Sequence, residues 1–433
     1  MNYRPVVDHV AVPTYLDPLS AVLFAGAFVA AALIARRRPA YGLGALLLAT
    51  PFDFSRDVLA TTITLPKCVL LGVLLALTTV PSVWRGLRRP PSAPILGALL
   101  LYLVVTVASA AGAAHAGPVA RESLKWLEYA ALFAVAFCCY RLDADDDALL
   151  TCAALAAIAV CISALAQEFA GAPSGLYIGS AIVPRIAGLL EGPNQLAAYC
   201  SVAAAVFGAW AIVRPLPLRA LALGLVTFAA ILTFSRAGIA TLAVVFLLLV
   251  LWGGRRALTG LRPAIVGAVA GAAGCAWWAF YAHTPGVLRI SLAPSAYAGG
   301  VGNRDELWRA AWRMFLARPL LGVGAGNFEL DLPQFGLYGV RTHANSWYLQ
   351  SLAEGGIVLF GATLALVVAS IGAFLRRPFL ASLRAQSPWV VAAVAASIAL
   401  ALHQIVDDFV FYPKVAAPWL LLLGIAAAAR RTA

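Results

Sequence analysis

Long apolar stretches alternate with short polar segments along most of the chain. None shows the alternation of period two that marks a membrane strand, so each is expected to form a helix, because lipid leaves backbone groups no other partner. A helix needs about 20 residues to cross a hydrocarbon core of about 30 Å. The pattern predicts an all-α, polytopic integral membrane helix bundle of about twelve (eleven to thirteen) transmembrane helices. The candidate spans are 18–35, 40–52 (a short one), 66–84, 93–111, 123–140, 148–169, 194–213, 220–234, 236–252, 263–281, 346–375, 389–406 and 413–429.

Composition and charge support this interpretation. The chain is 62% hydrophobic and only 12% charged, whereas soluble domains are about a quarter charged. The net charge of +12 is spread over short arginine clusters between spans, which mark the cytoplasmic side of a membrane rather than a nucleic-acid surface. The seven cysteines lie inside apolar spans without metal-ligand spacing, which argues against disulfides and structural zinc. We therefore expect residues 1–433 to form one membrane domain surrounded by lipid, with no nucleic-acid partner.

One long segment, 283–345, interrupts the membrane pattern and is expected to face the extracytoplasmic side. Within it, 303–319 (NRDELWRAAWRMFLARP) predicts an amphipathic helix at the membrane surface, with Asn303 and Glu306 as a capping pair. The apolar face is expected to hold Leu307, Ala311 and Phe315, widened by Trp308 and Trp312.

The arginines of this helix have two interpretations. Arg309 and Arg313 are interpreted as interfacial anchors. Arg304 lies in the first turn, where free N–H groups favour an anion, so it is equally a candidate phosphate ligand. The GVGAGN run at 322–327 predicts a tight turn, because it lacks the strand and acidic residue of a dinucleotide site.

Two further arginines lie where charge is costly. Arg236, in TFSRAG, stands between two apolar runs, where burial costs about 2.5–3.5 kcal/mol, so it should face a cavity or pair with Glu168 or Asp407. Arg185, in PRIAGLLEGPNQLAAY, is placed similarly. His343, flanked by Arg341 and Asn345 and directly before a span, is a candidate general base, although a histidine at an interface is often only a polar anchor.

Three carboxylate groups have structural explanations. The aspartates at 143 and 145–147 look like metal ligands, but a solvated helix start on the cytoplasmic side explains them better. Arg121, Glu122, Lys125 and Glu128 have helical spacing and are expected to pair among themselves. Asp407 and Asp408 follow a span, where either can hold an arginine or the histidine.

Several of these pieces occur together in a known family. GNRDELWRAAWRMFLARPLLGVGAGNF followed by THANSWYLQSLAEGGIVLFG resembles the signature of the O-antigen ligase and polymerase superfamily. RIAGLLEGPNQLAAY, TFSRAG and HQIVDDFVFYP fit as well, so that the resemblance covers about 180–412. Many members have H-x-H-N where this chain has His343-Ala344-Asn345-Ser346, so only the first histidine is present.

The resemblance implies a GT-C-like glycosyltransferase of the bacterial inner membrane, with its active site facing the periplasm. It would move O-antigen polysaccharide from an undecaprenyl-diphosphate carrier to a lipid A-core acceptor, with inversion and without metal or cofactor. His343 would be the general base, and Arg185, Arg236 and Arg304 would bind the diphosphate, with Arg236 and Arg304 counted as catalytic. The further ligands of glycan or diphosphate would be Arg341, Asn194 and Asn345.

Three other functions stay open at this stage. An O-antigen polymerase would extend the same carrier-linked glycan, and a protein O-oligosaccharyltransferase would use a serine or threonine acceptor. A transporter of polyprenyl-phosphate lipid would use the arginines only for binding. The single long outer segment favours the ligase or the protein transferase over the polymerase.

Overall fold

The computed structural model describes residues 18–52, 54–58, 61–169, 174–178, 181–281, 304–375 and 386–430. The fold is all-α, as the sequence predicts, with two short antiparallel hairpins, β1 (Ser55–Val58) with β2 (Thr61–Thr64) and β3 (Ser174–Ile178) with β4 (Ala181–Arg185). The first half of the chain holds α1 (Pro18–Arg37), α2 (Pro39–Ala49), α3 (Leu65–Thr78), α4 (Pro81–Trp84), α5 (Ser92–Ala108), α6 (Ala116–Leu142), α7 (Asp146–Phe169) and α8 (Pro193–Val213). The second half holds α9 (Pro217–Leu232), α10 (Arg236–Gly253), α11 (Arg255–Gly260), α12 (Arg262–Tyr281), α14 (Arg304–Ala317), α15 (Phe328–Asp331), α16 (Trp347–Gly372), α18 (Pro388–His403) and α19 (Pro413–Ala429).

The expected number of membrane spans fits these helices. Within the described ranges, seven helices are long and apolar enough to cross a membrane (α1, α5, α6, α7, α8, α10 and α16), and six more apolar helices have 10–17 residues. Many apolar side chains on their outer faces are exposed, among them Leu33, Val104 and Val269. An exposed apolar belt of this kind suits a lipid solvent, so the structure is that of a multi-pass membrane protein.

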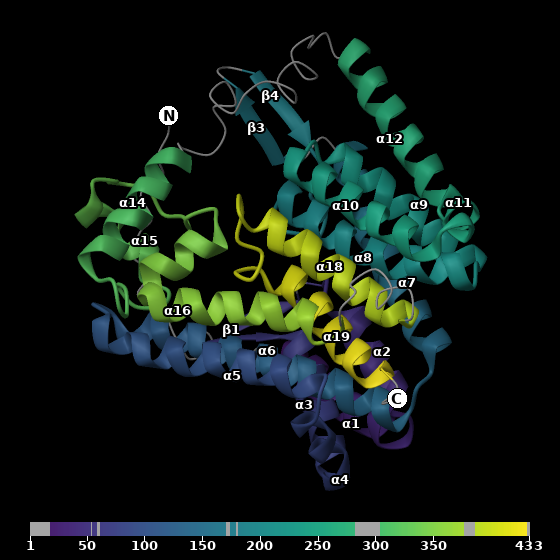
Figure 1. Ribbon diagram of the computed structural model, residues 1–433, viewed down its shortest axis with the longest axis horizontal. Coiled ribbons are helices and arrows are strands. Elements are labelled where there is room, and N and C mark those ends of the chain that lie inside the picture. Colours follow the sequence, from purple (N-terminus) through teal and green to yellow (C-terminus); the bar gives the residue numbers. More distant parts are fainter. Residues whose placement is uncertain are drawn as a thin grey trace.

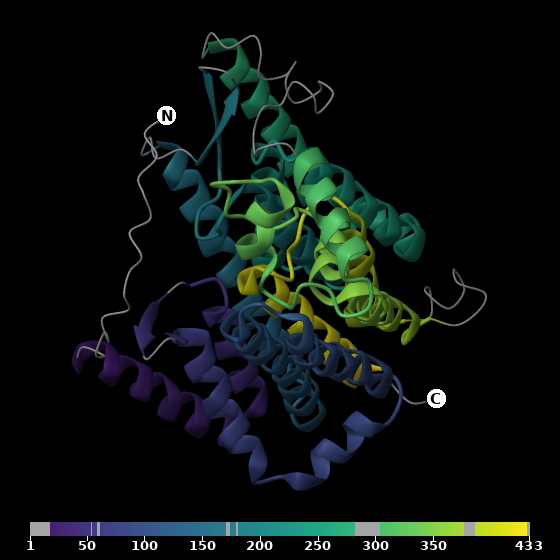
Figure 2. The same cartoon turned by 90° about the vertical axis from the view of Figure 1, so that its left-hand side faces the viewer.

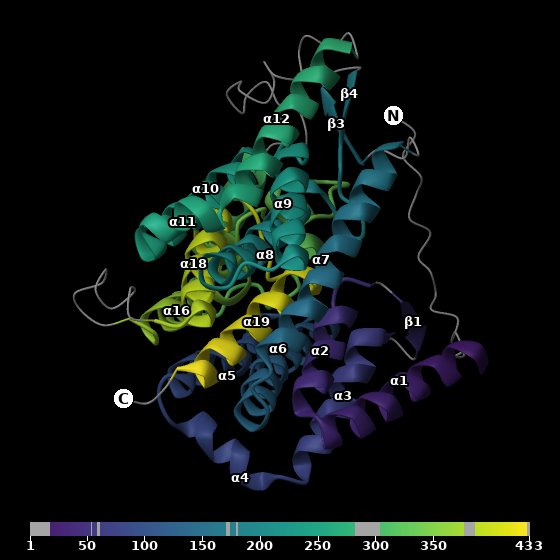
Figure 3. The same cartoon turned by 90° about the vertical axis from the view of Figure 1, so that its right-hand side faces the viewer.

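The last two helices form the centre of the bundle. Helix α19 packs along α6, and α18 packs against α8 and α10, so that they lie between the N-terminal helices and the α8–α12 group (Figures 2 and 3). Most residues of α18 and α19 are buried. Helices α14 and α15 lie together at the end of the bundle opposite the C-terminus (Figure 1). The loops that lead into α16 and α19 meet at this same end.

The aspartates at the start of α7 hold helix ends together at the opposite end. Asp143 and Asp145 pair with Arg38 at 2.9 and 3.0 Å, and Asp147 pairs with Arg214 at 2.9 Å and with Arg219. Asp146 accepts hydrogen bonds from Tyr140 and Trp389. The cluster lies at a helix start, as predicted, with Asp147 exposed, and its carboxylates also have partners on other elements or on the neighbouring turn. On α6, Lys125 pairs with Glu122 at 2.6 Å as predicted, whereas the carboxylate of Glu128 faces Lys67 at 3.9 Å.

The amphipathic helix α14 packs on protein more than the sequence suggests. Leu307, Ala310, Ala311 and Met314 are buried in a small cluster with residues of the 323–332 segment and of α16. Trp312, expected on the apolar face, is 49% exposed. The buried stripe of α14 is therefore narrower than the predicted apolar face, because only the side chains that face α16 and the 323–332 segment are covered. The predicted cap, Asn303, lies outside the described residues.

The helical hydrogen bonds of α16 are interrupted near Gly356, and the glycine-rich turn pairs with backbone groups that the interruption leaves free. Gly356 has a left-handed φ of 60°, which interrupts the helical hydrogen bonds. The carbonyl groups of Ala353 and Glu354 accept instead from Val323 (2.9 Å) and Gly324 (2.8 Å). The amide of Ile357 donates to the carbonyl of Pro319 at 2.8 Å. The GVGAGN run is thus a turn, as predicted, and it satisfies backbone groups that the break exposes.

Candidate functional site

His343 lies on the loop before α16, with both ring nitrogens engaged. Its Nδ1 accepts a hydrogen bond from the backbone N–H of Asn345 at 3.1 Å. Its Nε2 lies 2.8 Å from the hydroxyl of Tyr412, which precedes α19. Since Nδ1 faces a donor, the proton of the neutral ring is assigned to Nε2, which donates to Tyr412.

The surroundings of His343 keep the ring neutral. Burial lowers the pKa of His343 below its usual 6.5, and the positive charge of Arg304 lowers it further, while Asp407 opposes the shift. A neutral imidazole has a lone pair to receive a proton, and that lone pair is on Nδ1. The side chain is half-buried, so part of the residue is accessible from outside.

Three arginines from separate segments meet near this ring. Arg185 ends β4, Arg236 is the first residue of α10 and Arg304 is the first residue of α14. Burial lowers the pKa of Arg185 to about 10, and the nearby charges of Arg304 and Arg236 contribute to the shift. Like charges gathered at one place are costly, and an arginine stays protonated at neutral pH. The cluster is therefore a positive site suited to an anion.

Arg185 is fixed by two hydrogen bonds. Its Nε donates to the carbonyl oxygen of Thr233 at 2.6 Å, at the turn between α9 and α10. Its Nη2 donates to Oδ1 of Asn194 at 2.9 Å, and Nδ2 of Asn194 donates to Oδ2 of the buried Asp407 at 2.9 Å. The sequence-based suggestion that Asp407 holds an arginine is thus realised through an intervening amide. The side chain of Glu168, the other suggested partner, is not described.

Two other predicted residues differ in their settings. Asn345 is 6% exposed and has a left-handed φ of 51°, and within the described residues its Nδ2 has no hydrogen-bond partner. A buried unpaired amide donor is costly, and its position beside His343 suits contact with a substrate oxygen. Arg341 is exposed on the same loop, and in the described part of the chain it makes no hydrogen bond or ion pair. The structure therefore brings Arg185, Arg236, Arg304, Asn194, His343 and Asn345 together and leaves Arg341 at the rim.

Sequence reasoning missed three residues at this site. Tyr412 contacts His343 directly, and Gln195 is near enough to hydrogen-bond the hydroxyl of Tyr412. Gln350 accepts from the N–H of Ala344 at 2.7 Å and donates to Glu354 at 2.8 Å. All three lie in the quoted motifs (HQIVDDFVFYP, EGPNQ and HANSWYLQ), so the signal was present. The partners of Tyr412 and Gln195 are distant along the chain, whereas those of Gln350 are four and six residues away.

Among the described residues, no group of three or more histidine, cysteine, aspartate or glutamate side chains is arranged to hold a metal ion. The metal-free chemistry expected from the sequence stays a prediction. The site instead offers guanidinium groups as its cationic elements.

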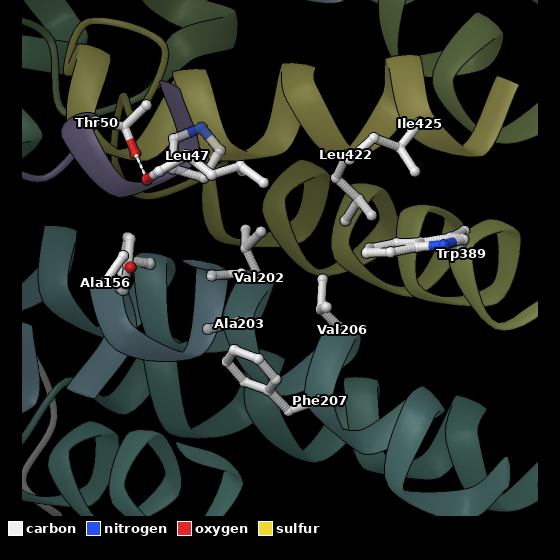
Figure 4. Close-up of a pocket in the computed structure, with 13 residues that line it drawn as sticks. Leu47, Thr50, Ala156, Val202, Ala203, Val206, Phe207, Trp389, Leu422 and Ile425 are labelled. Atoms are coloured by element: carbon white, nitrogen blue, oxygen red, sulfur yellow. Dashed lines mark hydrogen bonds between the residues drawn. The ribbon is translucent and has the colours of Figure 1, made fainter. Parts of the chain in front are cut away.

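A separate cavity of about 540 Å³ lies deeper in the bundle. Figure 4 shows Leu47, Val206, Trp389 and Leu422 around it, contributed by α2, α8, α18 and α19. No charged side chain lines it, so it suits only apolar material. Helix α8 connects it to the arginine site, because Asn194 is in the first turn of that helix.

A known protein family matches part of the chain. The family model described as O-antigen ligase matches residues 221–364, a stretch that includes Arg236, Arg304 and His343. This match confirms the resemblance seen in the sequence. The elements that carry Arg185, Asn194 and Tyr412 lie outside the matched stretch and are joined to it by the hydrogen bonds described above. No curated protein matches the chain.

Proposed function

We propose that this chain, which carries the O-antigen ligase family segment, joins O-antigen polysaccharide to the lipid A-core. The donor would be the glycan on undecaprenyl diphosphate, and transfer would take place on the periplasmic face of the bacterial inner membrane. The observation that carries the proposal is the convergence of three arginines and a neutral histidine at one end of a membrane bundle. A diphosphate leaving group needs cationic groups to stabilise its charge, and a nucleophilic hydroxyl needs a base to take its proton, so the two must lie close together.

The arginines would act on the leaving group. As the bond between the anomeric carbon and the diphosphate oxygen breaks, its electron pair goes to that oxygen. Arg185, Arg236 and Arg304 supply guanidinium groups that bind phosphate oxygens and neutralise this charge. Because Thr233 and Asn194 hold Arg185, its orientation is set before the charge develops. The developing charge is therefore stabilised without reorganisation of the site.

His343 would act on the acceptor. Its Nδ1 takes the proton of the acceptor hydroxyl, which replaces the N–H of Asn345 at that nitrogen, while the hydroxyl oxygen bonds to the anomeric carbon. Attack opposite the departing diphosphate inverts the configuration of that carbon. The imidazolium that forms is stabilised by Asp407 and by the bond from Nε2–H to Tyr412. Tyr412 thus serves as a positioning residue that selects the productive tautomer.

Replacing Tyr412 by phenylalanine should lower the rate of transfer at least about tenfold, because the ring of His343 loses the partner that fixes its tautomer. The measurement is in vitro transfer by the purified protein, with the affinity for the carrier determined separately. Carrier affinity should be unchanged, since the arginines are intact. An unaltered transfer rate would exclude Tyr412 from the mechanism.

The proposed function is tested by lipopolysaccharide banding in a strain from which the gene is deleted. The ligase predicts that all O-polysaccharide disappears from lipid A-core while carrier-linked polymer accumulates. Re-expression of the wild-type chain should restore the bands.

Two other outcomes would overturn the ligase assignment. Collapse of the ladder to core plus one repeat would indicate a polymerase instead. An unchanged lipopolysaccharide pattern would exclude both enzymes.

A further inference from the structure

A second cavity, of about 350 Å³, lies close to His343 and is distinct from the arginine cluster. It lies between α5, α6, α16 and the 408–411 segment, at the same end of the bundle as α14. Part of this space is open to solvent. The lining residues are Tyr102, Glu122, Lys125, Trp126, Gly326, Trp347, Gln350, Glu354, Asp408, Val410 and Phe411.

The charged groups that line this cavity are mostly acidic, whereas the arginine cluster is positively charged. Three carboxyl groups, those of Glu122, Glu354 and Asp408, face a single cation, Lys125, whose ammonium pairs with Glu122 at 2.6 Å. Glu122 and Lys125 are partly exposed and form the mouth, whereas Glu354 and Asp408 are buried. A phosphate or another anion is therefore disfavoured here and favoured at the arginines.

Asp408 offers an unused hydrogen-bonding atom at the base of the cavity. The residue is 3% exposed, and its Oδ1 accepts from the N–H of Phe411 at 3.2 Å. Within the described part of the chain, its Oδ2 has no hydrogen-bond partner. Burial raises the pKa of Asp408 to about 7, so the carboxyl group can donate as well as accept. Because protein atoms do not enclose this oxygen, it is open to a ligand in the cavity.

Aromatic rings make up much of the remaining wall. Tyr102 stacks on Trp126 with a centroid distance of 3.6 Å, and Trp347 lies on the other side of Tyr102 at 6.1 Å. Phe411 closes the cavity beneath the ammonium of Lys125, 5.0 Å from its ring centre. Tyr102, Trp126 and Trp347 are each 5% exposed or less, whereas Phe411 is 46% exposed, so the face of Phe411 is the one that can meet the C–H face of a sugar ring.

Two contacts connect this cavity to His343. The ring of Phe411 lies 5.3 Å from that of His343, centre to centre. Gln350 bridges the two sites, because it accepts from the backbone beside His343 and donates to Glu354 in the cavity wall. The ring of Phe411 therefore lies between a molecule in the cavity and His343. The cavity approaches His343 from the side of Phe411, not from the side of Arg304.

We infer that this cavity binds the acceptor sugar, and that the sugar bound there is uncharged or carries an amine. The inference rests on the proposed glycan transfer, and it assigns the two substrates to opposite sides of His343. The anionic carrier lies on the arginine side, while the acceptor hydroxyl enters from the carboxylate side. A phosphorylated or otherwise acidic terminal sugar would be excluded.

The test uses the full-length protein in nanodiscs and two probes. These are undecaprenyl diphosphate and the soluble core oligosaccharide released from the lipid A-core of the deletion strain. Asp408→Asn keeps the shape of the side chain and the bond to Phe411 but removes the charge, and it should weaken core oligosaccharide binding about tenfold or more. Binding of undecaprenyl diphosphate should not change, which also shows that the variant is folded. Glu306→Gln, on the exposed side of α14, is the matched control and should bind both probes as the wild type does.

The outcomes separate this inference from the proposed function. Wild-type binding of both probes, with Asp408→Asn equal to the wild type on the oligosaccharide, would overturn the acceptor subsite alone. Failure of the wild type to bind undecaprenyl diphosphate would count against the proposed function itself. If the oligosaccharide does not bind but a carrier-linked single repeat does, and Asp408→Asn weakens it, the subsite stands and the acceptor is that of a polymerase. Tighter binding of a phosphorylated sugar than of a neutral one by the wild type would contradict the charge argument.

Discussion

Replacing His343 by alanine should lower the rate of glycan transfer by about 10²–10⁴-fold, the usual contribution of a general base. The reason is that Nδ1 is the lone pair placed to receive the acceptor proton, with Nε2–H held by Tyr412 at 2.8 Å. Affinity for undecaprenyl diphosphate should be retained, since Arg185 and Arg236 do not depend on the ring for their positions. The measurement is single-turnover transfer by purified protein, with carrier binding determined in parallel.

The matched control is His115→Ala, because that histidine lies at the same end of the bundle with an exposed side chain. Its contacts with Asn327 use backbone atoms, so the substitution should leave transfer unchanged. Full activity in His343→Ala would eliminate the ring as the base.

The fall of kcat/KM at low pH should reflect protonation of His343. The pKa of His343 is lowered by burial and by Arg304, so the neutral, active form persists to a pH below its usual 6.5. The rate constant kcat/KM should therefore fall only as the pH drops below that value. In Arg304→Gln the cation is removed, and the residual activity should show the acid limb shifted to higher pH.

Replacing Arg185 by glutamine should lower transfer by about 10²–10³-fold, as expected when a preorganised donor to a developing oxyanion is lost. Arg185→Lys keeps the charge but cannot bond both Thr233 and Asn194, so it should recover only part of the rate. Both variants should bind undecaprenyl diphosphate more weakly than the wild type. Transfer assays and carrier titration with the purified variants give the two values.

Arg309→Gln serves as the control, because Arg309 is exposed on α14 and is assigned only an anchoring role. Equal losses in Arg185→Gln and Arg309→Gln would mean that general positive charge, rather than a placed guanidinium, matters. An Arg185→Lys variant with the full wild-type rate would show that the two hydrogen bonds have no role in transfer.

The helical spans were predictable because one physical rule dominates them. A segment surrounded by lipid must be apolar and must satisfy its own backbone, so the apolar runs give the helices within a few residues. The predicted span 194–213 compares with Pro193–Val213, and 236–252 with Arg236–Gly253. Helix α14 was placed correctly as well, but its buried stripe depends on the contact with α16, which its own periodicity does not contain.

The candidate site was only partly predictable. Arg185, Arg236 and Arg304 were singled out separately, because charge beside apolar runs is costly wherever it occurs. Their meeting point depends on how α8, α10 and α14 pack, and no local pattern encodes that. The same limit hid Tyr412, which lies 69 residues from His343. The second cavity was not predicted at all, since its acidic residues come from two helices and a loop and look like ordinary ion pairs along the chain.

The glycine-rich turn after α14 attaches that helix to the rest of the site. Pro319, Val323 and Gly324 bond α16 on both sides of Gly356, and Asn327 is bonded to the backbone of His115 at the start of α6. The segment after α14 is thus fastened to two helices of the bundle. Arg304 and His343 therefore belong to one rigid frame. The entropic cost of positioning them arises during folding and does not recur each time substrate binds. For the proposed transfer, such a frame would admit a long, flexible polymer without having to close over it.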